Sequence, residues 1–233
     1  MISVGTAVLI AVLAAAVPAH GAELALVLAV DVSASVTADS YVLQREGIAR
    51  AFASPRLVEA ISAVPGGMEV LVLEWSDPDK IAVTVDWARI ADPASAAAFG
   101  TAVRATRRSS SGLTAIGPAL LAAAAAFDRL PEPAVRRVID LSGDGIANFG
   151  LPPAAARDRV VASGIAVNGL AILSGEPWLA DYYRVNVIGG PSGFVVVART
   201  FQSFADAMLR KLVQELAGAV PTFALREPSR QMQ

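Results

Sequence analysis

Short apolar runs alternate with amphipathic or alanine-rich segments along most of the chain. Residues 24–30 contain no polar side chain, which is typical of a strand buried on both faces of a parallel sheet. Further strands are predicted over residues 68–75, 80–87, 137–142, 165–172 and 194–198. Helices are predicted from Thr37 or Asp39 to about residue 52, over residues 56–63, 93–106, 115–130, 154–163 and 178–183, and along an apolar stripe from Phe201 to Leu216. This alternation predicts an α/β, doubly wound fold with a mostly parallel central sheet flanked by helices.

One pair of strands breaks the parallel pattern. Residues 68–75 and 80–87 are separated only by Ser76, Asp77, Pro78 and Asp79, which are common turn residues. The pair is therefore predicted to form an antiparallel hairpin at an edge of the sheet. We interpret Asp77 and Asp79 as turn residues rather than as calcium ligands.

The N-terminal segment differs in composition from the rest of the chain. Residues 1–19 are almost wholly apolar, and no charged side chain precedes Glu23. Small residues at Ala19 and Gly21 suit a signal peptidase, so residues 1–21 are predicted to be a signal peptide; an uncleaved anchor is the alternative, since no Lys or Arg precedes the apolar run. We then expect a periplasmic or secreted domain over residues 22–220, without a membrane span in the mature chain, and a loose tail over residues 221–233.

Composition excludes several kinds of chemistry. The chain has 233 residues, no cysteine, a formal net charge of −2 and a single histidine, His20, inside the predicted leader. Without Cys or His, the mature protein cannot build disulfides, a Ser-His-Asp or Cys-His centre, or a zinc site of thiolates and imidazoles. The near-zero net charge argues against nucleic acid as the main partner.

Oxygen-bearing side chains gather in three predicted loops. Asp31, Ser33 and Ser35 follow the first strand, Thr114 precedes a helix, and Asp144 follows the strand over residues 137–142. Ligands of open α/β sheets bind at the carboxyl ends of the strands, and Mg²⁺ prefers oxygen ligands. Taken singly, these residues have simpler explanations, because Asp, Ser and Thr are good helix N-caps and Asp144-Gly145 fits a plain turn.

The ordered set resembles the von Willebrand factor A domain. That family carries a metal-ion-dependent adhesion site built from Asp-x-Ser-x-Ser, a later Thr and a later Asp in an Asp-Gly turn. The resemblance covers residues 23–219. Four further motifs look like a bacterial, exported family of unknown function with this fold: Leu-Gln-Arg-Glu-Gly at 43–47, Ser-Gly-Asp-Gly at 142–145, Asn-Gly-Leu-Ala-Ile at 168–172 and Tyr-Tyr at 182–183.

The resemblance implies a ligand set and a function. Ser33, Ser35 and Thr114 would bind Mg²⁺, or Mn²⁺, through their hydroxyls, while Asp31 and Asp144 would act largely through water. An open coordination position would accept an Asp or Glu carboxylate from a protein or peptide, as in a non-enzymatic binding module. The chain departs from the usual pattern at one position, where Gly143 replaces a Thr and removes one hydroxyl.

Two other functions stay open on the sequence. A haloacid-dehalogenase-like phosphatase would use Asp31 as its nucleophile, but such chemistry needs a second acid two residues later, where this chain has Ser33. A structural envelope protein with a vestigial site is the other alternative. A dinucleotide site is not indicated, because residues 31–36 contain no glycine.

Several remaining residues are given structural interpretations. Arg104, Arg107 and Arg108 are expected on a solvated face, and Asp140 is expected to face an arginine or a polar neighbour without a site role. Asn148 and Asn168 are interpreted as hydrogen-bonding residues of a loop and a strand end. Trp75, Trp87, Tyr182 and Tyr183 are expected to serve packing.

Overall fold

The computed structural model describes residues 21–217. These residues contain one six-stranded sheet with the strand order β3-β2-β1-β4-β5-β6. The strands are β1 (Ala22–Asp31), β2 (Met68–Trp75), β3 (Ile81–Ile90), β4 (Ala134–Gly143), β5 (Ala166–Ile172) and β6 (Val195–Ala198). All neighbours are parallel except β2 and β3, which are antiparallel, with β3 at the edge. The predicted doubly wound sheet and its edge hairpin are therefore confirmed. Apart from Gly21, the predicted leader and tail lie outside the described residues.

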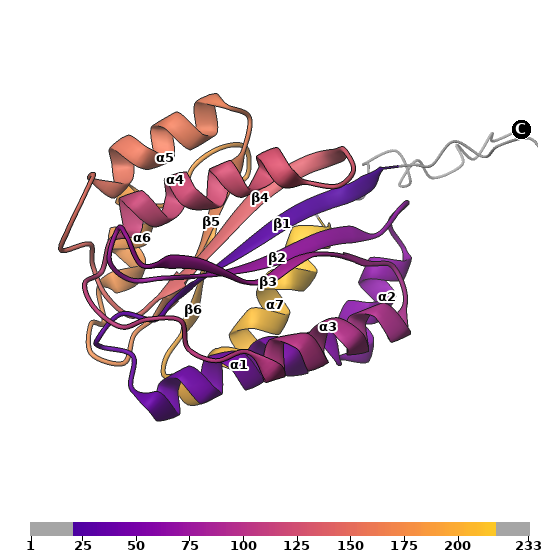
Figure 1. Ribbon diagram of the computed structural model, residues 1–233, viewed down its shortest axis with the longest axis horizontal. Helices are drawn as coiled ribbons and strands as arrows, with labels where there is room; N and C mark the ends of the chain where they lie inside the picture. The colour runs from indigo at the N-terminus through magenta and orange to yellow at the C-terminus, as the bar shows by residue number, and fades with distance from the viewer. Residues whose placement is uncertain (1–20, 218–233) are drawn as a thin grey trace, which may run out of the picture.

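Helices cover both faces of this sheet (Figure 1). They are α1 (Ala38–Phe52), α2 (Pro55–Ser62), α3 (Pro93–Ala105), α4 (Ile116–Ala126), α5 (Pro153–Ala162), α6 (Leu179–Asn186) and α7 (Phe204–Ala217), with the short 3₁₀ helices η1 (Phe127–Arg129) and η2 (Phe201–Ser203). One layer contains α1, α2, α3 and α7, and the other contains α4, α5 and α6. Across residues 21–217, no helix has the length and apolar character needed to span a bilayer.

Strand β1 lies at the centre of both hydrophobic cores. Leu24, Leu26 and Leu28 point into the core under α1 and α7, whereas Ala25 and Val27 point into the core under α4. This alternation follows from the two-residue period of a strand, and it explains why the run needs no polar residue. Each fully buried leucine contributes about 1.5–3 kcal/mol of transfer free energy.

The predicted N-caps of two helices are confirmed, but one helix end was wrong. Thr37 Oγ1 accepts a hydrogen bond from the Ser40 amide at 3.1 Å, and Asp92 caps α3 in the same way. The helix predicted over residues 115–130 ends as α4 at residue 126 and continues as η1. Leu130 is extended because it precedes Pro131, whose ring disfavours helical backbone at the residue before it. Strand β3 is longer than predicted, since Ile90 pairs with Met68 at the start of β2.

A buried ionic cluster joins α7 to the sheet. The Lys211 Nζ atom lies 3.1 Å from both Asp140 Oδ1 on β4 and Glu215 Oε1, and all three side chains are fully buried. Asn168 Nδ2 donates to the same Glu215 oxygen at 2.7 Å, and the ammonium lies 4.5 Å from the Phe194 ring centroid. Burial raises the pKa of Asp140 to about 6 although the lysine opposes this shift. Of the two alternatives for Asp140, the structure thus shows a polar neighbour, Lys211, rather than an arginine.

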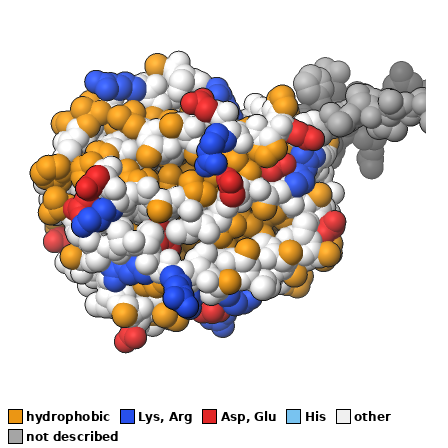
Figure 2. Space-filling view, viewed as in Figure 1, with side chains coloured by type: hydrophobic (Ala, Val, Ile, Leu, Met, Phe, Trp, Pro, Cys, Tyr) orange, Lys and Arg blue, Asp and Glu red, His pale blue; other side chains and the backbone are white. Residues whose placement is uncertain are grey.

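Charge is dispersed on the face of the molecule drawn in Figure 2. Basic and acidic side chains occur there in small groups, separated by apolar and uncharged ones. The drawn face therefore presents charges of both signs rather than one extended patch of a single sign.

Candidate metal site at the carboxyl edge of the sheet

The three polar loops meet at the carboxyl ends of β1 and β4, which are adjacent and parallel. Ser35 Oγ donates a hydrogen bond to Asp144 Oδ1 at 2.7 Å, joining residues that are 109 positions apart. The Ala34 amide donates to the Gly112 carbonyl at 2.9 Å, which places the loop before Thr114 beside the same residues. The structure thus brings together the loops that carry the five residues singled out in the sequence.

Asp31 is the most buried acid of this group. Its Oδ1 accepts a hydrogen bond from the Ser33 amide at 2.7 Å, while Oδ2 is buried without a hydrogen-bond partner among residues 21–217. Ser33 Oγ lies 3.2 Å from Ser35 Oγ. Burial raises the pKa of Asp31 to about 7, because the charged form has lost its hydration. A carboxylate in this state gains from any nearby positive charge.

Thr114 is held by the loop that follows β4. Its amide donates to Asn148 Oδ1 at 2.8 Å, and its carbonyl accepts from the Asn148 amide at 3.1 Å. The N-cap of α4 is Ala115, which makes no side-chain cap. The alternative that Thr114 caps this helix is therefore wrong, whereas the prediction of Asn148 as a loop hydrogen-bonding residue is confirmed.

Arg108 connects the first two loops, which the sequence did not indicate. Its Nη2 donates to the carbonyls of Val32 and Ser33 at 2.7 and 2.8 Å, and its Nε donates to the Ser110 carbonyl at 2.9 Å. The expectation that the whole basic cluster is solvated is wrong for this residue, although Arg104 and Arg107 are exposed. The local sequence does not indicate that Arg108, rather than Arg107, would make these hydrogen bonds.

We expect Arg108→Ala to lower the free energy of unfolding by about 1–3 kcal/mol, because three hydrogen bonds from a charged group are lost. Urea unfolding measures this change. The matched control is Arg107→Ala, which should change stability by less than about 0.5 kcal/mol because its side chain is exposed. Equal effects of the two variants would contradict a bracing role for Arg108.

Two acids of the hairpin fix the loop that leads to Thr114. Glu74 Oε2 accepts from the Ser109 amide at 2.7 Å, and Asp77 Oδ1 accepts from the Leu113 amide at 2.8 Å. Gly112 leaves room for this contact, since a Cβ at this position would lie 2.3 Å from Asp77 Oδ2 and displace the carboxylate. Asp77 is thus more than a turn residue, because it also positions the neighbour of Thr114.

The donor set fits a hard cation better than a soft one. It consists of the hydroxyls of Ser33, Ser35 and Thr114 and the carboxylates of Asp31 and Asp144. Within residues 21–217, no group of three or more His, Cys, Asp or Glu side chains forms a metal-binding cluster. Oxygen donors and the unpaired Asp31 Oδ2 suit Mg²⁺ or Mn²⁺, for which hydroxyl and carboxylate oxygens are adequate ligands.

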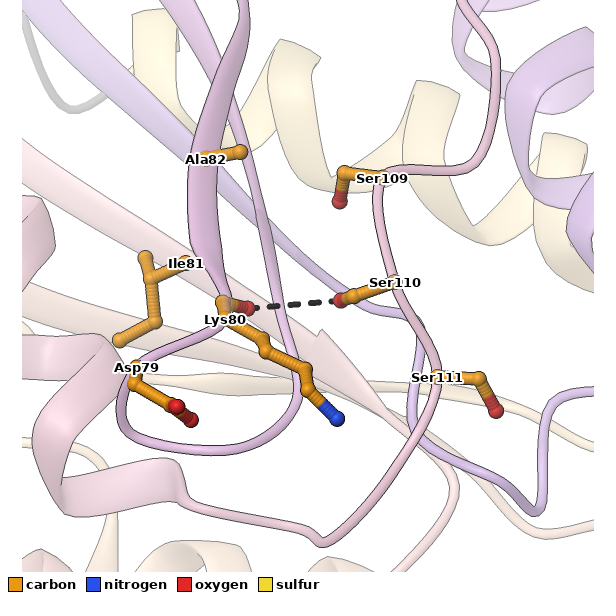
Figure 3. Close-up of a pocket in the computed structure, with 7 residues that line it drawn as sticks. All are labelled: Asp79, Lys80, Ile81, Ala82, Ser109, Ser110 and Ser111. Atoms are coloured by element: carbon orange, nitrogen blue, oxygen red, sulfur yellow. Dashed lines mark hydrogen bonds between the residues drawn. The ribbon is translucent and has the colours of Figure 1, made fainter.

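A pocket of about 410 Å³ adjoins the Thr114 loop (Figure 3). It lies between the start of β3 and residues 109–111, where Ser110 Oγ donates to the Lys80 carbonyl at 3.4 Å. The Lys80 ammonium in this pocket is paired with Asp77 at 2.6 Å. The pocket therefore adjoins the loop that leads to Thr114, and the Asp79 carboxylate also lines it.

Large apolar side chains are exposed around the same edge. Among the described residues, the exposed Leu, Ile, Phe and Trp side chains are Leu113, Ile146 and Phe149, which lie on these loops, and Trp178, which lies on the connection between β5 and α6. Leu113 precedes Thr114, and Ile146 and Phe149 follow Asp144. Trp178 is the N-cap residue of α6, whose Tyr182 hydroxyl accepts from the Ala147 amide at 3.2 Å. We call these four residues the apolar rim.

The fold and the ordered loops define a von Willebrand factor A-like domain, and solved structures agree. The mussel byssus protein PTMP1, in a structure titled as having a zinc-occupied MIDAS motif, is 18% identical over 84% of this chain and 46% of its own, with a TM-score of 0.62. The pilus adhesin SpaC from Lactobacillus rhamnosus GG is 16% identical over 85% and 30%, with a TM-score of 0.59. The vWF domain of the pilus tip protein Mfa5 from Porphyromonas gingivalis is 12% identical over 86% and 97%, with a TM-score of 0.61.

The chain belongs to the family described as "Protein of unknown function (DUF1194)", whose model matches residues 21–220. The suspected membership of a family of unknown function with this fold is thereby confirmed. No curated protein matched the chain significantly. The chain spans less than half of PTMP1 and less than a third of SpaC, so these likenesses establish the fold alone.

Proposed function

We propose that this protein is an exported binding module that captures a carboxylate of a protein partner through a Mg²⁺ or Mn²⁺ ion. Ser33, Ser35 and Thr114 would bind the ion through hydroxyls, with Asp31 and Asp144 beside them. The observation that carries the proposal is the Ser35–Asp144 hydrogen bond of 2.7 Å, which joins two of the loops into one oxygen-only centre.

The charge of the donor set explains the kind of ligand. If the direct protein ligands are three neutral hydroxyls, the ion keeps most of its positive charge, and an anionic oxygen is its best additional ligand. Asp and Glu side chains supply such an oxygen. The carboxyl edge of the sheet leaves the site accessible, since Ser35 is exposed.

The apolar rim supports a protein segment rather than a free small anion. Exposed aromatic and aliphatic side chains around a polar centre are typical of protein interaction sites, and Trp and Phe often dominate their energetics. The pocket beside the Thr114 loop offers additional room for a side chain that flanks the captured carboxylate. We therefore infer an acidic residue with apolar neighbours in the partner.

The similar structures support export and adhesion. Their titles describe a byssus thread matrix protein, a pilus adhesin, a pilus tip protein and, from Streptococcus sanguinis, the minor pilin PilB. These are mainly structural or adhesive proteins. By analogy, we place this domain outside the cytoplasm and assign it no enzymatic activity.

The phosphatase alternative gains no support from the geometry. Ser33 occupies the position of the second acid, and its amide bonds to the proposed nucleophile Asp31. The buried lysine of α7 contacts Asp140 and Glu215 on the face of the sheet that α7 covers, rather than Asp31. The other alternative, a structural protein with a vestigial site, is tested by metal titration, because a vestigial site would not bind the ion.

The proposal is tested by titration and then by selection of ligands. Calorimetry with the purified domain should show one site for Mg²⁺ or Mn²⁺, and Thr114→Ala should weaken it at least tenfold while sparing the fold. Immobilised domain should then retain displayed peptides with a central Asp in Mg²⁺ and release them in EDTA. Exposed Thr101 supplies the matched control, Thr101→Ala. Absence of metal binding, or peptide capture that persists undiminished in EDTA, would refute the function.

A further inference from the structure

Gly143, the last residue of β4, leaves a space that two oxygen atoms approach. A Cβ built on Gly143 would lie 2.7 Å from Tyr183 Oη and 2.8 Å from Asp31 Oδ2. The phenol of α6 and the carboxylate of β1 therefore converge on the place that a side chain at position 143 would occupy. This is the position where the von Willebrand factor A pattern usually has a threonine.

A second glycine makes room for the same tyrosine. A Cβ on Gly169 of β5 would lie 2.8 Å from Tyr183 Cδ1. Two adjacent strands thus lack side chains where one aromatic residue lies, Gly143 beside its hydroxyl and Gly169 beside its ring. Tyr183 is completely buried, so the arrangement delivers its hydroxyl to the interior below the candidate site.

Packing by itself does not explain why residue 183 carries a hydroxyl group. Among residues 21–217, neither Tyr183 Oη nor Asp31 Oδ2 has a hydrogen-bond partner, although both are buried. An unsatisfied buried hydroxyl is destabilising, and a phenylalanine would fill the same space without it. Burial and the nearby Asp31 and Asp144 raise the pKa of Tyr183 well above its ordinary value, so the phenol remains a donor at neutral pH.

We propose that Tyr183 is a positioning residue of the metal site, whose hydroxyl supports the charged Asp31 carboxylate in place of the hydroxyl missing at Gly143. This inference rests on the proposed metal-dependent function and deepens it. The sequence interpretation of Tyr183 as a packing residue accounts for its ring but leaves its hydroxyl without a role. Its neighbour Tyr182 has a different task, because its hydroxyl accepts from the Ala147 amide.

Tyr183→Phe should separate stability from metal binding. We expect a roughly tenfold weaker affinity for Mg²⁺ by calorimetry, together with an unchanged or higher thermal midpoint of the metal-free protein, because an unsatisfied buried hydroxyl is removed. A purely structural tyrosine would leave the affinity unchanged. Tyr182→Phe serves as the matched control and should keep the affinity of the natural chain.

A compensating substitution makes the test specific. Gly143→Ser alone should destabilise the protein, since its Cβ would crowd Tyr183 Oη and Asp31 Oδ2. Tyr183→Phe removes the shorter of these two contacts, so in the double variant only the Asp31 carboxylate has to shift, and the serine hydroxyl should restore part of the lost Mg²⁺ affinity. Equal Mg²⁺ affinity of Tyr183→Phe and the natural chain, or a double variant no tighter than Tyr183→Phe, would overturn the role of Tyr183. If the natural chain itself does not bind Mg²⁺, the metal site is refuted rather than the role of Tyr183.

Discussion

Replacing Asp31 with asparagine should abolish Mg²⁺ binding and, at the same time, stabilise the metal-free protein at pH 8. The buried carboxylate has a pKa of about 7 instead of its ordinary 3.8, so its charged form is disfavoured in the folded state. Asparagine has nearly the same shape and can still accept from the Ser33 amide. The gain is at most about 4 kcal/mol, since each pKa unit corresponds to about 1.4 kcal/mol.

The direction in which stability changes with pH distinguishes the effect of the buried Asp31 charge from a simple change in packing. Between about pH 4 and pH 7 the folded natural chain keeps a proton on Asp31 that the unfolded chain has released, so Asp31 makes stability fall as pH rises through this range. Asp31→Asn should lack this contribution. Thermal unfolding in EDTA at pH 5 and pH 8 measures it, with exposed Asp39→Asn as the control. A variant that is less stable than the natural chain at both pH values would contradict the prediction.

Lys211→Ala should lower the free energy of unfolding by about 3–5 kcal/mol, because it leaves Asp140 and Glu215 buried without the cation that lies 3.1 Å from each of them. The loss should be larger at pH 8 than at pH 5. Without the ammonium, which opposes the rise in the pKa of Asp140, this carboxyl group takes up a proton more readily in the folded state, so acid relieves the unpaired charge.

Urea unfolding tests this prediction, and the chain supplies a matched control. Lys80 is the only other lysine; its side chain is 47% exposed, and it pairs with Asp77. Lys80→Ala should cost less than about 1 kcal/mol, as is usual for exposed ion pairs. Similar losses in both variants would show that burial of the α7 cluster contributes little to stability.

Much of the architecture could be predicted because its causes are local. The uninterrupted apolar run of β1 indicated a strand with two buried faces, and Thr37 and Asp92 marked the starts of α1 and α3 as N-caps. The four turn residues after β2 indicated the antiparallel edge hairpin. The order of the oxygen-bearing loops then indicated one edge of the sheet, because parallel strands place their carboxyl ends together.

The sequence by itself therefore determined the fold class, the positions of most elements and the five candidate site residues. Only the tertiary structure decided which polar side chains support them. Arg108 braces the β1 loop although its neighbour Arg107 is exposed, Lys211 pairs with Asp140 across 71 positions, and the Tyr183 hydroxyl and the Asp31 carboxylate both lie beside Gly143. Periodicity reports which face of an element is buried, but a partner distant in the chain is chosen by how strands and helices pack. For that reason the candidate site residues could be predicted from motifs, whereas their electrostatic surroundings could not.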